Sequence, residues 1–253
     1  MKKMRWVALL CLVVTTASAA QRDEKADAVG QELLTSLGGP AVFEKARQFQ
    51  FDFVVEGEGK TIARFSHVWD RYTGDYRLAG TEKTGAPFTV YFNVNTRLGK
   101  AFVNGRPAEP QRQEQLLKTS YERFINDTYW LLAPWKIFDP GVHLAYDGEK
   151  PCPNGGDCDV LRLSFEESVG LTPKDVYWLW ISRQGRQMVA WQYVLGGAQE
   201  EPTTALWTNW KKFAGLSLSL DKPISGRPVA IRFENVSVSP ARDDSLFAPP
   251  AAP

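Results

Sequence analysis

One stretch near the middle of the chain, residues 121–141 (YERFINDTYWLLAPWKIFDPG), interrupts the alternation of apolar and polar residues on either side of it. The apolar positions that lead into it have the spacing of one helical stripe: Leu117, Tyr121, Phe124 and Ile125. Pro134 limits the helix, because proline lacks a backbone donor and disfavours helical geometry at the residue before it. A helix this rich in aromatic side chains needs a large apolar partner surface. We therefore predict a helical insert at residues 110–138 that serves as a plug or lid against a concave sheet.

Strand patterns occupy most of the remaining chain. The clearest runs from Phe49 to Val55, where apolar side chains fall on one face and polar ones on the other. Residues 176–181 (VYWLWI) are apolar on both faces, so we expect this strand to be covered on both sides. Residues 203–213 are predicted as one strand, and residues 21–48 as helix interrupted at Gly38-Gly39-Pro40. Many short strands with tight turns are typical of a sandwich or a barrel-like antiparallel sheet.

The first 20 residues, MKKMRWVALLCLVVTTASAA, have the three regions of a secretory signal peptide: a basic start, an apolar stretch and a small-residue end. We expect cleavage and export, and the form of the signal suits a bacterial periplasm. No linker divides residues 21–253, which predicts a single domain. Removing the signal leaves a net charge of −2 with histidine neutral. Without a basic block, nucleic-acid binding is not expected.

Cys152 and Cys158 are the cysteines that remain after the signal, in the segment PCPNGGDCD. The five residues between them include two glycines and one proline, so the loop can bend to bring the sulfur atoms together. An exported protein meets oxidising conditions. We predict a disulfide at a loop tip, since a redox or metal site would need CxxC spacing or nearby histidines.

No pattern in the chain indicates catalysis. The two histidines are His67 and His143, and His67 falls in phase with apolar residues of a strand, which predicts a buried or cavity-lining side chain. HExxH, GxSxG and glycine-rich phosphate loops are absent from the sequence. Asp243 and Asp244 are neighbours in an extended tail, where successive side chains point apart. We assign no catalytic residue, metal ligand or cofactor, and predict that the protein is not an enzyme.

A set of segments follows a characteristic order along the chain: a leader and N-terminal helix, the strand at 49–55, WDRYTGDYRL (69–78), a mid-chain helix, LWTNWKKFAGLSLSLDKP (206–223), AIRFENVSV (230–238) and DDSLFAPP (243–250). In this order the segments resemble the LolA/LolB superfamily of lipoprotein carriers, and the last segment is the most specific. The resemblance covers most of the chain after the leader. The helix at 121–141 and the cysteine loop are additions to that pattern.

The resemblance implies a mainly β fold with helices (α+β), namely an unclosed antiparallel β-barrel covered by the N-terminal and mid-chain helices. In that superfamily the apolar interior accepts acyl chains of lipoproteins or other lipids. Trp69 and Arg71 resemble the segment in which a basic residue helps to hold the lid closed. The candidate residues for lining or gating the interior are Phe51, Phe53, Phe65, Trp69, Arg71, Leu78, Tyr121, Phe124, Trp130, Leu131, Trp135, Trp178, Trp180 and Trp191.

These observations leave three classes of function. The first, which we expect, is a monomeric periplasmic binder or carrier of a lipid or lipoprotein acyl chain. The second is a module of the cell envelope that binds a protein partner on the same fold. The third, a secreted enzyme, is disfavoured by the missing nucleophile and metal motifs. A dry cavity under the mid-chain helix would favour the first class, and a filled barrel with an exposed aromatic patch the second.

Overall fold

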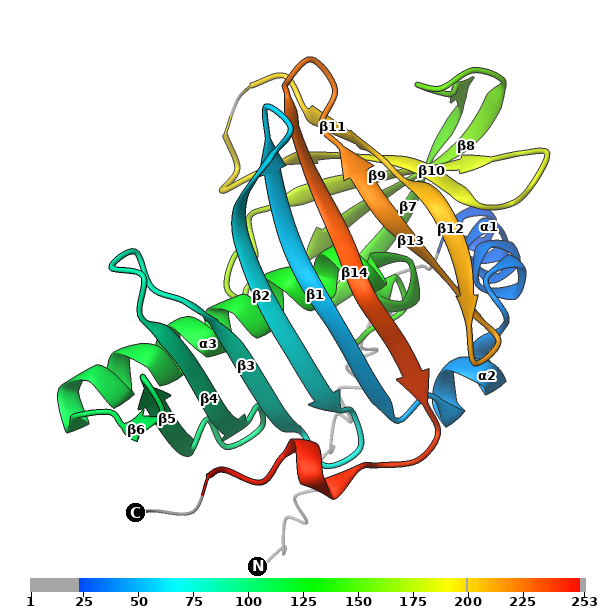
Figure 1. Ribbon diagram of the computed structural model, residues 1–253. Helices are drawn as coiled ribbons and strands as arrows, with labels where there is room; N and C mark the ends of the chain where they lie inside the picture. Colours follow the sequence, from blue (N-terminus) through cyan, green and yellow to red (C-terminus); the bar gives the residue numbers. More distant parts are fainter. Residues whose placement is uncertain (1–22, 199, 251–253) are drawn as a thin grey trace, which may run out of the picture.

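The computed structural model describes residues 23–198 and 200–250, which form two antiparallel sheets and three α-helices (Figure 1). The larger sheet has nine strands in the order β12 (Thr208–Phe213), β13 (Leu216–Pro223), β14 (Val229–Ser239), β1 (Gln48–Gly57), β2 (Lys60–Asp70), β3 (Asp75–Thr81), β4 (Pro87–Asn93), β5 (Gly99–Val103) and β6 (Arg106–Pro107). The smaller sheet has five strands in the order β11 (Thr203–Leu206), β10 (Met188–Val194), β9 (Val176–Ser182), β8 (Asp157–Phe165) and β7 (Val142–Pro151).

Within the described residues neither sheet closes on itself, so the predicted class, a mainly β fold with an open half-barrel and helices, is confirmed. The predicted signal peptide, residues 1–20, lies outside the described residues. Among those that are described, no helix is both long enough and apolar enough to cross a membrane.

The mid-chain helix is present as predicted. Helix α3 (Pro110–Leu132) continues into a 3-10 turn, η1 (Ala133–Lys136), and Pro134 lies inside that turn. Figure 1 shows α3 crossing one face of the nine-stranded sheet, from the β5–β6 end toward the smaller sheet. We call this face the inner face. The helix contacts β4, β5 and β13 along its course, so one element spans nearly the whole width of the half-barrel.

Two short helices cover the other end of the interior. Helix α1 (Glu24–Ser36) begins at Asp23, whose carboxylate accepts a hydrogen bond from the Ala26 amide at 3.0 Å, as an N-cap should. Its apolar side chains are buried, and it packs against β7 and β8. Helix α2 (Pro40–Lys45) starts after Gly39, which has φ +86°, so the predicted interruption at Gly38-Gly39-Pro40 is confirmed.

Residues 203–213, predicted as one strand, form two strands in two different sheets. β11 pairs with β10 and β12 pairs with β13. Between them Trp207 is 2 % exposed, and its ring lies 5.7 Å from Trp191 and 6.1 Å from Trp210. Asn209 adopts φ +53°, a conformation that asparagine tolerates and that redirects the chain. The prediction was wrong because apolar alternation does not report which sheet a strand joins.

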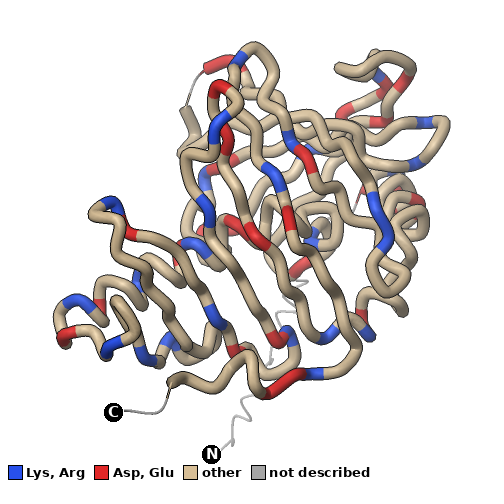
Figure 2. The backbone as a smooth tube through the Cα atoms, viewed as in Figure 1, with Lys and Arg blue, Asp and Glu red and all other residues tan. Residues whose placement is uncertain are grey.

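The larger sheet carries charged residues of both signs, and the acidic residues of β1 lie beside basic residues of β2 and β14 (Figure 2). Arg64 pairs with Asp52 at 3.0 Å and with Glu234 at 2.7 Å. Arg232 pairs with Glu56 at 2.6 Å. Exposed pairs of this kind add little to stability, so the outer face serves mainly to solvate the sheet.

The C-terminal segment is fixed to the sheet by a buried carboxylate. Asp70, at the end of β2, accepts hydrogen bonds from Arg47 at 2.9 Å and from Arg242 at 2.9 Å. Arg242 also pairs with Asp75 at 2.6 Å. Burial raises the pKa of Asp70, but the bonds from the two arginines outweigh it and hold that pKa well below its usual range.

We expect Asp70→Asn to lower the free energy of unfolding by about 3 kcal/mol at pH 7, because the two arginines then lose their charged partner. The native carboxylate is ionised when folded, so its stabilisation is complete above the unfolded-state pKa of about 3.9 and is lost as pH falls through the lowered folded-state pKa. Urea unfolding of both proteins across this pH range measures the effect. A stability gap that grows on acidification would contradict the assignment.

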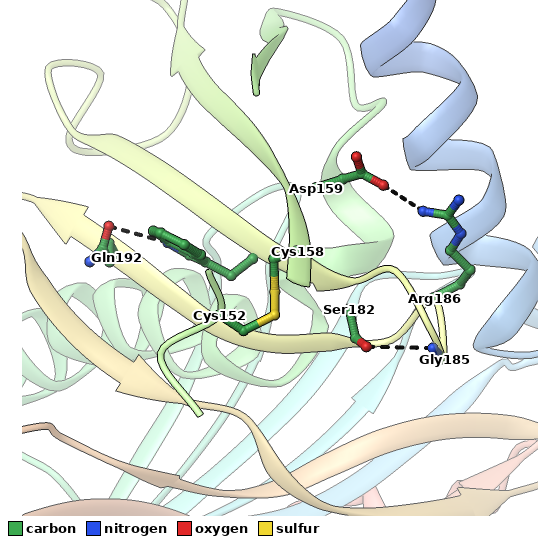
Figure 3. Close-up of a disulfide and its surroundings, with 8 residues drawn as sticks. Cys152, Cys158, Asp159, Ser182, Gly185, Arg186 and Gln192 are labelled. Atoms are coloured by element: carbon green, nitrogen blue, oxygen red, sulfur yellow. Dashed lines mark hydrogen bonds and ion pairs between the residues drawn. A yellow bond between two sulfur atoms is a disulfide. The ribbon is translucent and has the colours of Figure 1, made fainter. Parts of the chain in front are cut away.

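The predicted disulfide between Cys152 and Cys158 is present, with Cα atoms 5.2 Å apart (Figure 3). It joins the end of β7 to the start of β8 and packs against Trp180 on the side of the smaller sheet that faces away from α3. The Trp180 indole also donates to Gln192 at 3.2 Å. The strand at 176–181 was expected to be covered on both sides, and this holds for Leu179 to Ile181, whereas Val176 and Trp178 are only half-buried.

Replacing both cysteines by serine should lower the free energy of unfolding by about 2 kcal/mol, because the bridge closes only a short loop. Urea unfolding of the double variant, compared with the native chain with and without reductant, measures this. A native chain that reductant does not destabilise would contradict the expectation.

A candidate binding interior under helix α3

The candidate residues divide into two packed groups on the inner face. The first lies under the N-terminal half of α3, where Tyr121 and Phe124 join the cluster around Leu78. The Phe124 ring is 5.2 Å from Trp69 in edge-to-face geometry. Phe65 belongs to the same cluster. Aromatic pairs in this arrangement add to the free energy gained by burial.

The second group lies under the C-terminal half of α3 and η1, in the main core. Leu131 and Trp135 are buried there together with Phe51 and Phe53 of β1. Trp191 of β10, 2 % exposed, connects the smaller sheet to the helix, and its ring lies 4.4 Å from that of Trp130, 5.1 Å from Tyr177 and 5.7 Å from Trp207. Both sheets and the helix thus meet at one aromatic cluster.

The structure does not bring Trp178 and Trp180 to this interior, which corrects the candidate set. β9 alternates, so Leu179 and Ile181 face α3 while the two tryptophans face the disulfide. The sequence pattern of this strand is apolar on both sides, and periodicity alone does not identify the inner one.

Arg71 was expected at the mouth of the interior, in contact with a ligand head group or with a helix that closes it, and the structure shows the contact with a helix. Its guanidinium donates to the carbonyl oxygens of Phe43, at 2.7 Å, and Glu44, at 3.1 Å, near the end of α2. The cation also lies 4.1 Å from the centre of the Phe43 ring, which stacks on Trp135 at 4.7 Å. Burial lowers the pKa of Arg71. A strand end, a short helix and the end of α3 are therefore linked through one side chain.

A buried polar network holds the middle of α3 to the sheet. His67 Nδ1 lies 2.5 Å from the Tyr76 hydroxyl, and His67 Nε2 lies 3.2 Å from a carboxylate oxygen of Asp127 on α3. Both ring and carboxylate are fully shielded from solvent. Arg123 approaches the same oxygen at 3.6 Å. Burial, and then the negative charge of Asp127, raises the pKa of Tyr76 well above its usual range, so this hydroxyl stays protonated.

Side chains fill the interior between α3 and the sheets in the part of the chain that the structure describes. The packed rings of the two groups occupy the space that a ligand would need. An open cleft of about 270 Å³ lies elsewhere, between the C-terminal tail and strands β3 to β5, with Tyr91 and Phe247 in its wall. No group of three or more potential metal ligands occurs in the described residues.

Comparison of the fold with solved structures gives a match over most of the chain. A LolA superfamily protein from Nitrosomonas europaea superposes with a TM-score of 0.54 at 11 % identity, covering 88 % of this chain and 97 % of the other. The chain has a LolA-like fold. A DUF1329 family protein from Desulfovibrio piger gives a TM-score of 0.49 at 12 % identity, with coverage of 88 % and 97 %. No family model and no curated protein matches the sequence.

Within this LolA-like fold, several buried polar atoms around α3 have no hydrogen-bond partner in the described structure. On the helix and η1 they are Ser120 Oγ, an Asp127 carboxylate oxygen, Tyr129 Oη and Trp135 Nε1. On the facing strands they are His67 Nε2, Trp69 Nε1 and Trp191 Nε1. The two atoms of the His67–Asp127 pair are close enough to attract but are not aligned as a hydrogen bond. The other five atoms have no such ion-pair partner and weaken the seating of the helix.

Sequence reasoning missed two residues of this LolA-like interior. Asp127 occupies a buried position on α3, in line with Leu131 one turn away and Leu116 three turns away, and this phase could have indicated it. Lys222 continues the apolar alternation of Leu216, Leu218 and Leu220 on β13, and it is 0 % exposed. A charged residue in phase with an apolar face is the signal in both cases.

Proposed function

We propose that the protein is a non-catalytic binder or carrier of a lipid or lipoprotein acyl chain, acting in the periplasm after export. The ligand space is the interior under α3, and the helix is a plug that the ligand displaces. The leader-like residues 1–20, the open half-barrel and the apolar inner face support this proposal.

The observation that carries the proposal is that the interface between α3 and the sheets combines extensive apolar contacts with buried polar atoms that have no partner. Its contacts are aromatic and extensive, yet most of the unpartnered polar atoms of the structure lie along it. Buried polar atoms are normally satisfied in a permanent core, and each one left without a partner costs about 1–3 kcal/mol. A helix seated with these costs can leave the sheet more readily than its apolar area implies.

An acyl chain bound in the interior can replace the apolar contacts that α3 loses when it leaves the sheet. Burying each methylene group gains about 0.8 kcal/mol, so a long chain contributes roughly 10 kcal/mol before the costs of binding. The ligand shifts the population toward the open state only by its preference for that state. A protein whose interior is filled by its own side chains in the absence of ligand can therefore still bind a lipid, provided that the lipid prefers the open state strongly enough.

One observation favours a second function, a protein-binding module. The interior is filled by the chain's own side chains in the described structure, as it would be in a domain that holds no small ligand. In that case the partner would be another protein of the cell envelope, and the interior would remain closed.

To test the proposal, the chain without its leader is purified, extracted with organic solvent and analysed for lipid by mass spectrometry. We expect an acyl species at about one per chain, and uptake of a fluorescent fatty acid by the delipidated protein. Changing Trp130 and Trp135 to glutamine weakens the contacts that hold the plug closed, so the fatty acid should bind at least tenfold more tightly.

Trp178→Gln is the matched control, because this side chain is also half-buried but lies on the opposite side of the smaller sheet. It should leave uptake unchanged. Protein that carries no lipid and takes up no fatty acid would overturn the carrier proposal and favour the protein-binding module.

A further inference from the structure

Lys222 is a lysine in an apolar interior. It lies on β13, where alternation places it on the same side as Leu218 and Leu220, and its side chain is fully buried. Its ammonium donates to the carbonyl oxygen of Ser219. Burial lowers the pKa of this amine well below its usual range, against the opposing charge of Asp221.

The neighbours of Lys222 are aromatic rings instead of carboxylates. Its nitrogen lies 4.5 Å from the centre of the Trp207 ring and 4.4 Å from that of Phe233. Asp221, the next residue, is engaged elsewhere: it accepts from Asn209 at 3.1 Å and lies 3.8 Å from Arg232. Among the described residues, no carboxylate lies within ion-pair distance of the Lys222 nitrogen.

The surroundings of Lys222 are continuous with the proposed ligand space. The Phe233 ring is 5.6 Å from Phe51 and 5.6 Å from Phe53, both candidate residues of the inner face. Trp207 contacts Trp191, and the indole N–H groups of both lack a partner. This part of the apolar interior thus contains a buried amine that donates to the Ser219 carbonyl and packs on two aromatic rings.

We propose that Lys222 is the anchor for the carboxylate of an acyl ligand, so that the substrate class is free fatty acids or other acyl chains ending in a carboxylate. This inference rests on the proposed function, since the ligand reaches Lys222 only through the interior under α3. A carboxylate supplies one negative charge and acceptor oxygens, which is what a single ammonium group can pair with. A phosphate would call for more donors than the site offers.

The alternative is that Lys222 serves only the fold, held between the faces of Trp207 and Phe233. The two roles predict opposite effects of the substitution Lys222→Met on the stability of the protein. If the lysine serves the fold, Lys222→Met removes these cation–π contacts and destabilises the protein. If the lysine is kept for a ligand, replacing a desolvated amine that has no carboxylate partner by an apolar group stabilises the protein and removes selectivity for the acid.

The experiment compares cis-parinaric acid with its methyl ester, which has the same chain and no charge, as fluorescent ligands of the delipidated protein. We expect the native chain to bind the acid at least tenfold more tightly than the ester. Lys222→Met should bind both with the affinity of the native chain for the ester, and its midpoint of urea unfolding should rise. Lys212→Met, an exposed lysine on the neighbouring strand β12, should keep the native preference.

Equal binding of acid and ester by the native chain would overturn the assignment of Lys222 while leaving the lipid-binding function in place. Binding of neither ligand would overturn the proposed function, and the Lys222 inference with it. Lysophosphatidic acid that displaces the probe as well as oleic acid does would overturn the restriction to carboxylates. The comparison of acid and ester uses the native chain, so the result does not depend on whether a variant folds.

Discussion

Trp191→Ala should lower the free energy of unfolding by about 3–5 kcal/mol, a change typical of a large side chain removed from a packed core. The indole is 2 % exposed and lies among rings from α3, β9 and the β11–β12 connection, so the neighbours cannot all close on the space it leaves. If α3 is a plug, the same substitution loosens its C-terminal half. We therefore expect faster amide hydrogen exchange across residues 127–135, and faster uptake of a fluorescent fatty acid.

The matched control for Trp191→Ala is Trp178→Ala, which removes a half-buried tryptophan from the far side of the same sheet. It should cost less than half as much free energy and leave amide exchange in α3 unchanged. Equal effects of the two substitutions on exchange would show that the helix responds to overall stability, and would count against a plug that moves separately.

Asp127→Leu is the second change with a large expected effect. It removes the carboxylate that faces His67 and Arg123 beneath α3 and leaves their polar groups without that partner. Removing one member of a buried pair typically costs about 3–5 kcal/mol. Urea unfolding at neutral pH measures the loss.

Removing the rest of the network should recover much of the loss caused by Asp127→Leu. In the triple variant with His67→Phe and Tyr76→Phe, Arg123 is the one former neighbour of Asp127 that stays polar, and its side chain is 36 % exposed and reaches solvent. We expect the triple variant to be more stable than Asp127→Leu alone, because apolar groups of similar volume can replace a buried ionic network at little cost. Additive losses would contradict the view that these side chains act as one network.

Local patterns allowed much of this fold to be predicted. The stripe at Leu117, Tyr121 and Phe124 predicted α3, and alternation from Phe49 predicted β1. The two cysteines predicted their own bridge because few residues separate them. In each case the determining interactions are close in sequence. The order of segments then indicated the open half-barrel that the structure contains.

What the sequence did not reveal depends on contacts between distant segments. Trp178 and Leu179 are equally apolar, and only the position of α3 decides which of them faces the interior. The division of residues 203–213 between two sheets depends on the packing of Trp207 against Trp191. Lys222 was passed over because a lysine is ordinarily exposed, a tendency that a binding site can reverse.

The connections between the two sheets set the direction in which the half-barrel can open. On one side a single residue, Trp207, joins β11 of the smaller sheet to β12 of the larger sheet. A connection this short keeps the two sheet edges next to each other. On the other side the connection is α3 itself, about 35 Å long at 1.5 Å per residue, with its ends tied to β6 and β7. If α3 is the plug, its attachments to β6 and β7 let it move outward without leaving the two sheets. A lipid that enters beneath it would then meet the aromatic rings of the interior before Lys222, which packs against Trp207 at the β11–β12 connection.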